Sequence, residues 1–181
     1  MPEWKSFTFG EDGEATPTAE APTPASANPA MEPDEYAAKW GTEVSEVTIA
    51  RIEAVLEGDG LPHGSSEFIA FTQLEDIPFQ VHREPADAPW AQIETRILPV
   101  GEGHTEVSLQ AIANRWNTEH LQPTVFPIES EEGWILVAAS RFFVGEGLSD
   151  RQIHAMLRRG LIIGVSAAQE VPSFFDESSA E

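Results

Sequence analysis

The strongest structural signal in this chain is residues 111–171, AIANRWNTEHLQPTVFPIESEEGWILVAASRFFVGEGLSDRQIHAMLRRGLIIGVSAAQEV. It begins with the end of a helical pattern, and two apolar runs, Thr124–Ile128 and Trp134–Val144, then flank a turn of two glutamates and a glycine. Ser149 opens the longest helical pattern of the chain. The stretch predicts a helix, a β-hairpin and a second helix. Within the run Trp134–Val144 both faces are apolar and Arg141 is the only charged residue, which indicates a central strand or one covered on both faces.

The last helix is predicted to be buried on more than one side. Ser149 and Gln152 form a capping box at its start, and apolar residues cover nearly its whole circumference. Its two glycines each cost about 1 kcal/mol relative to alanine inside a helix. Close packing against the sheet or against another subunit is expected to offset that cost. The surface predicted for a partner or a dimer consists of Met156, Arg158, Arg159, Gly160, Ile163 and Gly164.

The residues before this unit predict one helix, three strands and another helix. The first helix starts at Thr42 or Ser45 and ends at Gly58, and the second starts at Thr105 or Ser108. Apolar and polar residues alternate along the strands, so the sheet should have one dry and one wet face. The three strands are expected at residues 67–73, 77–83 and 90–98.

The complete order is helix, three strands, helix, two strands, helix. It predicts an α+β fold with a mainly antiparallel, five-stranded sheet and helices packed on it. The domain should span residues 42–171, after a disordered acidic tail rich in proline, alanine and glutamate at 1–41 and before an acidic tail at 172–181. Three interpretations are open for the aromatic residues of the first tail, which are Trp4, Phe7 and Phe9. They form a peptide that binds a partner, they dock on the chain's own domain, or they have no role.

Charge and composition exclude several classes of protein. The formal net charge of -21 is spread along the chain, and acidic surfaces repel phosphate backbones, so nucleic acid is not an expected partner. The chain has no cysteine, which removes disulfides and thiolate sites and makes the cytoplasm the default location. No apolar run is long enough to span a membrane. We therefore expect a soluble cytoplasmic protein.

No catalytic constellation is visible, so we expect neither an enzyme nor a cofactor or metal site. The five histidines form no helical pair with i, i+4 spacing and no close trio with acids. There is no Gly-x-Ser-x-Gly elbow, and the two Gly-Glu-Gly turns place a carboxylate where a phosphate would approach. Glu131 and Glu132 are better explained by a solvated hairpin turn than by an acid/base dyad.

Trp116 and the pair Arg158–Arg159 have two interpretations each. Trp116 lies on the apolar side of its helix, so core packing is favoured over ligand contact, and Asn117 is placed to bond backbone near the helix end. Arg158–Arg159 is the only adjacent basic pair of the chain. It is either a solvated, ion-paired part of the last helix or an anchor for an acidic partner peptide or the protein's own tails.

The order of elements, together with the motifs Asn114–His120 and Leu148–Gln152, resembles the YbjN-domain family. The resemblance covers residues 44–171 and is sharpest in 109–158. It implies a fold like that of type III secretion chaperones and a non-catalytic, often dimeric protein-binding module. The long N-terminal tail departs from the family pattern.

Two functions from different classes follow. The first is a chaperone- or adaptor-like homodimer that binds a protein segment at a sheet edge or in an apolar groove beside the last helix. A regulatory role is one option for such a protein. The alternative is a small-molecule sensor or enzyme with a pocket between helix and sheet, which converging Arg141, His82 and glutamate side chains would favour. An acidic mimic of nucleic acid follows only from the net charge.

Overall fold

The computed structural model describes residues 7–9, 15–17, 39–83, 85, 87–99, 103–131 and 133–178. The chain divides into two units, residues 1–34 and 35–181. In the first unit, β1 (Phe7–Phe9) pairs with β2 (Ala15–Pro17) in antiparallel register, a pair that the sequence did not indicate. Of the rest of the predicted disordered tail, residues 1–6, 10–14 and 18–38, including Trp4, lie outside the described residues, whereas Trp40 near its end packs against the core of the domain.

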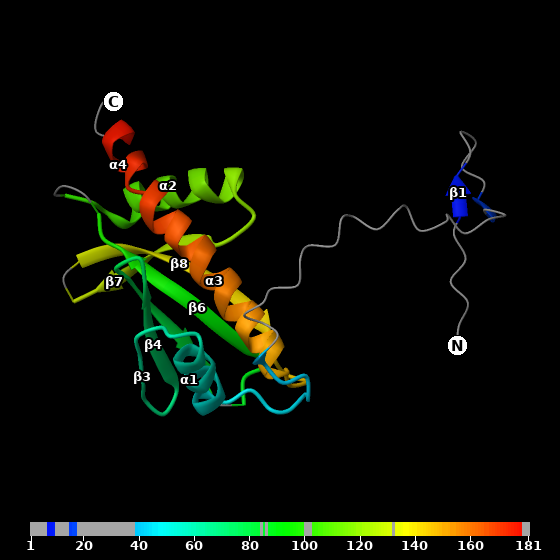
Figure 1. Ribbon diagram of the computed structural model, residues 1–181. Coiled ribbons are helices and arrows are strands. Elements are labelled where there is room, and N and C mark those ends of the chain that lie inside the picture. The colour runs from blue at the N-terminus through cyan, green and yellow to red at the C-terminus, as the bar shows by residue number, and fades with distance from the viewer. Residues whose placement is uncertain are drawn as a thin grey trace. The chain divides into compact units, whose positions relative to one another are not determined.

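The second unit is an antiparallel sheet with helices packed on it (Figure 1). The α+β class is confirmed, but the sheet has six strands and not five. The missed strand, β3, has only three residues and no apolar alternation, so it gives no strand signal. The sheet order is β3-β4-β5-β6-β8-β7. The elements are α1 (Ile49–Gly58), β3 (His63–Ser65), β4 (Ile69–Leu74), β5 (Ile77–His82), β6 (Trp90–Ile97), α2 (Glu106–Glu119), β7 (Thr124–Ser130), β8 (Gly133–Phe143), α3 (Asp150–Glu170) and α4 (Ser173–Ser178).

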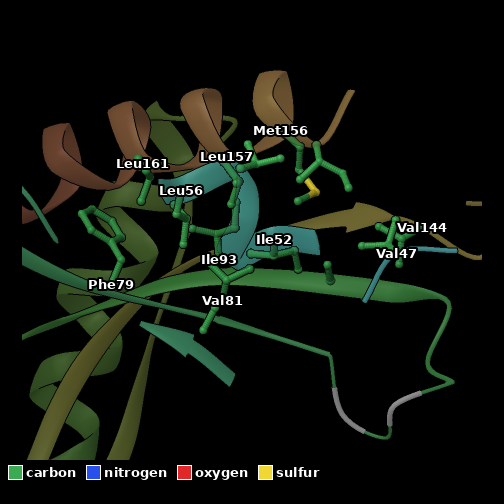
Figure 2. Close-up of a cluster of buried hydrophobic side chains, with 14 of the residues drawn as sticks. Val47, Ile52, Leu56, Phe79, Val81, Ile93, Val144, Met156, Leu157 and Leu161 are labelled. Atoms are coloured by element: carbon green, nitrogen blue, oxygen red, sulfur yellow. The ribbon is translucent and has the colours of Figure 1, made fainter. Parts of the chain in front are cut away.

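The described helices pack on one face of the sheet. Ile93 and Ile97 of β6 are four positions apart on a fully alternating strand, so their side chains share a face. Ile93 belongs to the core cluster under α1 and α3, which Figure 2 shows, and Ile97 belongs to the cluster under α2 and α4. Since both clusters lie on the same side, the opposite face of the sheet has no described helix over it.

The first helix begins later than predicted, at Thr48 and not at Thr42 or Ser45. Ser45 and Leu148 form an antiparallel bridge with two backbone hydrogen bonds of 3.0 and 3.2 Å, which holds the preceding segment extended. Arg51 fixes this segment further, because its guanidinium donates to the carbonyls of Ser45 and Leu148 and to Asp150. Tertiary hydrogen bonds therefore override a helical period in the sequence. The predicted capping box at Ser149 and Gln152 is confirmed.

The two glycines of α3 allow the helix to approach the sheet closely. A Cβ on Gly160 would lie 2.5 Å from Ile93 Cδ1 of β6, and one on Gly164 would lie 2.5 Å from Phe79 Cε1 of β5. The element that compensates for these glycines is thus the chain's own sheet. Met156 is buried in the same core.

The domain extends beyond the boundary predicted at residue 171. Val171 and Phe175 are buried in the cluster under α2, and α4 continues to Ser178. Arg115 of α2 lies over the Phe174 ring, 4.3 Å from its centroid. Residues predicted as the start of an acidic tail therefore form part of the packed domain, and their two phenylalanines provide the apolar surface that makes this possible.

Candidate functional site

The face of the sheet opposite the helices carries a chain of four polar side chains, of which three are joined by hydrogen bonds and the fourth, His82, lies within ion-pair distance of Glu94. His82 Nε2 lies 3.0 Å from Glu94 Oε2, and Gln92 Nε2 donates to the same oxygen over 2.7 Å. Arg141 Nε donates to Gln92 Oε1 over 2.6 Å. These residues come from β5, β6 and β8, and they meet because His82 and Arg141 both pair with Gln92 in the sheet register. His82, Arg141 and a glutamate, whose convergence would favour the small-molecule alternative, thus meet in a surface network on the face without described helices.

Glu94 is held in its charged form by this network. Burial by itself raises the pKa of its carboxyl, but hydrogen bonds from His82 and Gln92 and the positive charges of His82 and Arg96 outweigh burial. The pKa of Glu94 therefore lies below its ordinary value.

Replacing Glu94 with glutamine should give a stability loss that depends on pH. A carboxyl with a lowered folded-state pKa stabilises the fold above its unfolded-state pKa, about 4.3, and this contribution disappears as pH falls through the lower folded-state pKa. We expect Glu94→Gln to melt at a lower temperature than the parent chain at pH 7, with the difference narrowing toward pH 3. Thermal melts across that range measure it, and a difference independent of pH would contradict the expectation.

Exposed aromatic side chains lie on the same face. Trp90 and Phe143 are opposite each other in the register of β6 and β8, each about half exposed, with ring centroids 5.4 Å apart in an edge-to-face arrangement. Phe71 of β4 lies opposite Gln80, farther across the face, and is also exposed. Large exposed rings around a polar network are typical of an association surface.

Two hollows meet at Gln92 and Arg141. One has a volume of about 510 Å³ and the other of about 350 Å³, and each is lined by both of these residues. The larger hollow lies where β7 begins and the smaller one lies beside Trp90 and His82. The larger is lined by Gln92, Leu121, Gln122, Thr124, Phe126, Ala139, Ser140 and Arg141.

The outer edge of β7 is closed to a further strand at two points. Asn117 donates to the Val125 carbonyl over 2.7 Å and accepts from the Val125 N–H over 2.9 Å, so its amide takes the place of a neighbouring strand. Pro127 has no N–H to offer. Backbone bonding by Asn117, predicted from the sequence, is thereby confirmed, and Trp116 is buried as predicted. β3, at the opposite edge, has only three residues.

The end of β8 is an open strand edge. β7 begins at Thr124, which pairs with Ala139, so residues 140–143 pair with β6 alone in the described part of the chain. The backbone N–H and C=O of Val125 point away from β8 to Asn117, so those of its neighbour Thr124 point toward Ala139 of β8. The N–H and C=O groups of Ala139 therefore point toward β7. Because these groups alternate along a strand, those of Arg141 and Phe143 point to the same side, beyond the first residue of β7. The larger hollow lies along this segment.

Ser140 lines the larger hollow but is only 3% exposed, and its Oγ has no hydrogen-bond partner among the described residues. Ser140 pairs with Ile93 in the register, so its side chain lies on the helix-covered face of the sheet, opposite to that of Arg141. Its hydroxyl is therefore a buried group and not part of the open strand edge.

A second surface is a hollow of about 300 Å³ beside α3, lined partly by Leu157, Leu161 and Ile162. His154 Nδ1 lies 2.7 Å from Asp59 Oδ2 at its wall, and Lys39 Nζ lies 3.3 Å from Asp59 Oδ1. This hollow matches the predicted apolar groove beside the last helix.

The predicted partner surface on α3 is divided by the fold. Met156, Gly160 and Gly164 are buried against the sheet and are not accessible to a partner in the folded domain. Arg158 and Arg159 are exposed, and Ile163 is half-buried. Arg158 lines the groove beside α3, and Arg159 Nη2 donates over 3.3 Å to Gln122 at the rim of the larger hollow. The side chains of Phe7 and Phe9 lie outside the described residues.

The described residues contain no group of three or more His, Asp or Glu side chains that could hold a metal ion.

His120 stacks on Trp116 with ring centroids 3.6 Å apart, which gives it a packing role. No helix within the described ranges is both long and apolar enough to cross a membrane.

Comparison with known proteins places the fold. The crystal structure of YbjN from E. coli matches with a TM-score of 0.58 and 11% identity, covering 72% of this chain and 93% of that one. A structure of the HopA1-SchA chaperone-effector complex matches with a TM-score of 0.48 and 11% identity, covering 68% and 91%. No curated protein matches the chain. The model of the family YbjN, described as "Putative bacterial sensory transduction regulator", matches residues 48–171, and the chain therefore belongs to the YbjN family.

Proposed function

We propose that this chain is a non-catalytic protein-binding module that holds an extended segment of another protein against the open end of β8. The observation that carries the proposal is the backbone of Arg141 and Phe143, which lies beyond the first residue of β7 and faces the open side of β8, next to a hollow that Arg141 lines. Added strands bind through main-chain hydrogen bonds, and side-chain pockets select their sequence.

Other features of the domain support this site over the remaining edges. Asn117 and Pro127 obstruct β7, whereas the end of β8 is flanked by exposed Trp90 and Phe143. Natural sheets block edges that must not associate, so an edge left open beside exposed aromatic rings supports a binding role. The family description supports a regulatory use of such binding. A cytoplasmic homodimer, with Arg158, Arg159 and Ile163 near its interface, remains part of the proposal.

The test compares Phe143→Pro with Phe143→Ala. Both variants lose the aromatic ring, but only proline removes the outward N–H, and that N–H is not used by β6. Partners are captured from the native organism with the full chain, identified, purified and titrated against both variants. We expect Phe143→Pro to bind about ten-fold more weakly than Phe143→Ala, since one hydrogen bond contributes about 1 kcal/mol and its carbonyl partner is left unpaired. Equal affinities, with both variants folded, would overturn strand addition.

A small-molecule sensor is the second candidate, and the His82–Glu94–Gln92–Arg141 network favours it. The adjoining hollow of about 350 Å³ has the size of a small-ligand site, and Arg141 can bind an anionic group there. The Phe143 pair separates the candidates, because an anion held by the Arg141 side chain does not depend on the Phe143 N–H.

A further inference from the structure

We propose that the segment held at the end of β8 carries a carboxylate side chain facing Arg141 and an apolar side chain, two residues away, facing Phe143. This inference rests on the proposed strand addition and adds the chemistry of the partner.

The first argument is the distribution of ion pairs. The sequence has 31 acidic and 10 basic residues, so cations should find carboxylates easily. Arg51 and Arg83 each lie within 3.4 Å of a carboxylate oxygen. Arg141 and Arg159, in contrast, have no carboxylate within 4.0 Å among the residues that the structure describes. Both adjoin the larger hollow, Arg141 directly and Arg159 through Gln122.

The second argument is that Arg141 is held ready for an anion. Its Nε is fixed by Gln92, and Gln92 is fixed in turn by Glu94. Glu94 is shared with His82, so the carboxylate of this network is already engaged. The terminal nitrogens of Arg141 remain to donate to a carboxylate, the geometry in which arginine binds most strongly.

The third argument is the register of an added strand. Directly opposed residues of neighbouring strands place their side chains on the same face. The residue opposed to Arg141 therefore projects onto the open face beside the guanidinium. The residue opposed to Phe143 is two positions away and projects beside the Trp90–Phe143 pair. This spacing of one acid and one apolar residue is the same for parallel and antiparallel addition.

The net charge of the domain limits which acidic segments bind. Overall repulsion acts at long range, but it is screened over about 8 Å at physiological ionic strength, whereas a carboxylate in contact with Arg141 is not. Recognition then depends on the short-range contact. A segment with one well-placed acid is favoured over a polyacidic one.

The experiment selects random eight-residue peptides from a display library on the full chain. We expect enrichment of sequences with Asp or Glu two positions from a Val, Ile, Phe, Tyr or Trp residue. Arg141→Gln should weaken the best peptide about ten-fold and remove most of the difference between that peptide and its copy with the acid replaced by glutamine. Arg151→Gln is the control, because Arg151 is an exposed arginine of α3 that lines neither of the two hollows at Gln92 and Arg141.

The outcomes separate the two levels of the proposal. If the acid-to-glutamine peptide binds as well as its parent while Phe143→Pro still binds it about ten-fold more weakly than Phe143→Ala, strand addition stands and the carboxylate inference is overturned. If no peptide is enriched, or if the enriched peptides bind Phe143→Pro and Arg141→Gln as tightly as the parent chain, strand addition and the carboxylate inference are both overturned. Melting curves of the variants confirm that each is folded.

Discussion

Replacing Gly160 with valine is expected to lower the free energy of unfolding by about 3 kcal/mol, at the upper end of what overpacking usually costs. The first added carbon would already lie 2.5 Å from Ile93 Cδ1 and 3.2 Å from Ile93 Cβ. The terminal methyl group of Ile93 can rotate away from the added carbon, but the Cβ of Ile93 moves only with the backbone of β6. Equilibrium denaturation of the full chain measures the loss.

Ala155→Val is the matched control for this prediction. Ala155 is exposed on the same helix, so the added methyl groups meet solvent and the change should cost only a few tenths of a kcal/mol through helix propensity. A loss for Gly160→Val as small as that of the control would show that α3 does not press on β6. The result would also bear on the choice between the sheet and a second subunit as the element that Gly160 faces.

The parts of the fold that were predictable are those in which local pattern and tertiary packing agree. The capping box at Ser149 and the interior position of β8 follow directly from sequence. The apolar residues on both faces of β8 predicted a central strand or one covered on both faces, and β8 is a central strand. Val137 of its open face is 1% exposed and lies between its neighbours in register, Arg96 and Phe126, which are longer than it is.

The candidate site could be predicted only in part. The alternating pattern of β6 placed Gln92 and Glu94 on a wet face, and Arg141 was the one charge in an apolar strand. Their meeting with His82 depends on strand register and order, since β8 follows β6 in the sheet but is separated from it in sequence by α2 and β7. The open edge was equally hidden, because it arises from where β7 starts along β8.

The short elements were missed for a different reason. β3 has too few residues to show alternation, and α4 follows a proline and carries acidic residues that suggested a tail. In both cases the local sequence lacks a strand or helix pattern, and contacts with the rest of the domain stabilise the element. Phe175, buried under α2, is the residue that could have indicated a packed end to the chain.

Trp116→Ala is expected to lower the free energy of unfolding by about 4 kcal/mol, as for other fully buried tryptophans. Trp116 is 1% exposed in the cluster under α2, and its Nε1 donates to the Pro123 carbonyl over 2.9 Å. Trp116→Phe retains most of the apolar contact but leaves that carbonyl without its donor, so it should cost about 2 kcal/mol. Denaturation of both variants measures the two losses.

Trp116→Phe also connects the core to the proposed site. Pro123 joins Gln122, at the rim of the larger hollow, to Thr124 at the start of β7. Without the indole donor, this segment is held less firmly, and the peptide selected on the parent chain should bind Trp116→Phe several-fold more weakly at a temperature where the variant is fully folded. Val107→Ala, at an exposed position of the same helix, is the control and should raise stability by about a few tenths of a kcal/mol through helix propensity and leave binding unchanged. Unaltered peptide affinity in a destabilised Trp116→Phe would mean that the rim is positioned by the Asn117–Val125 hydrogen bonds alone.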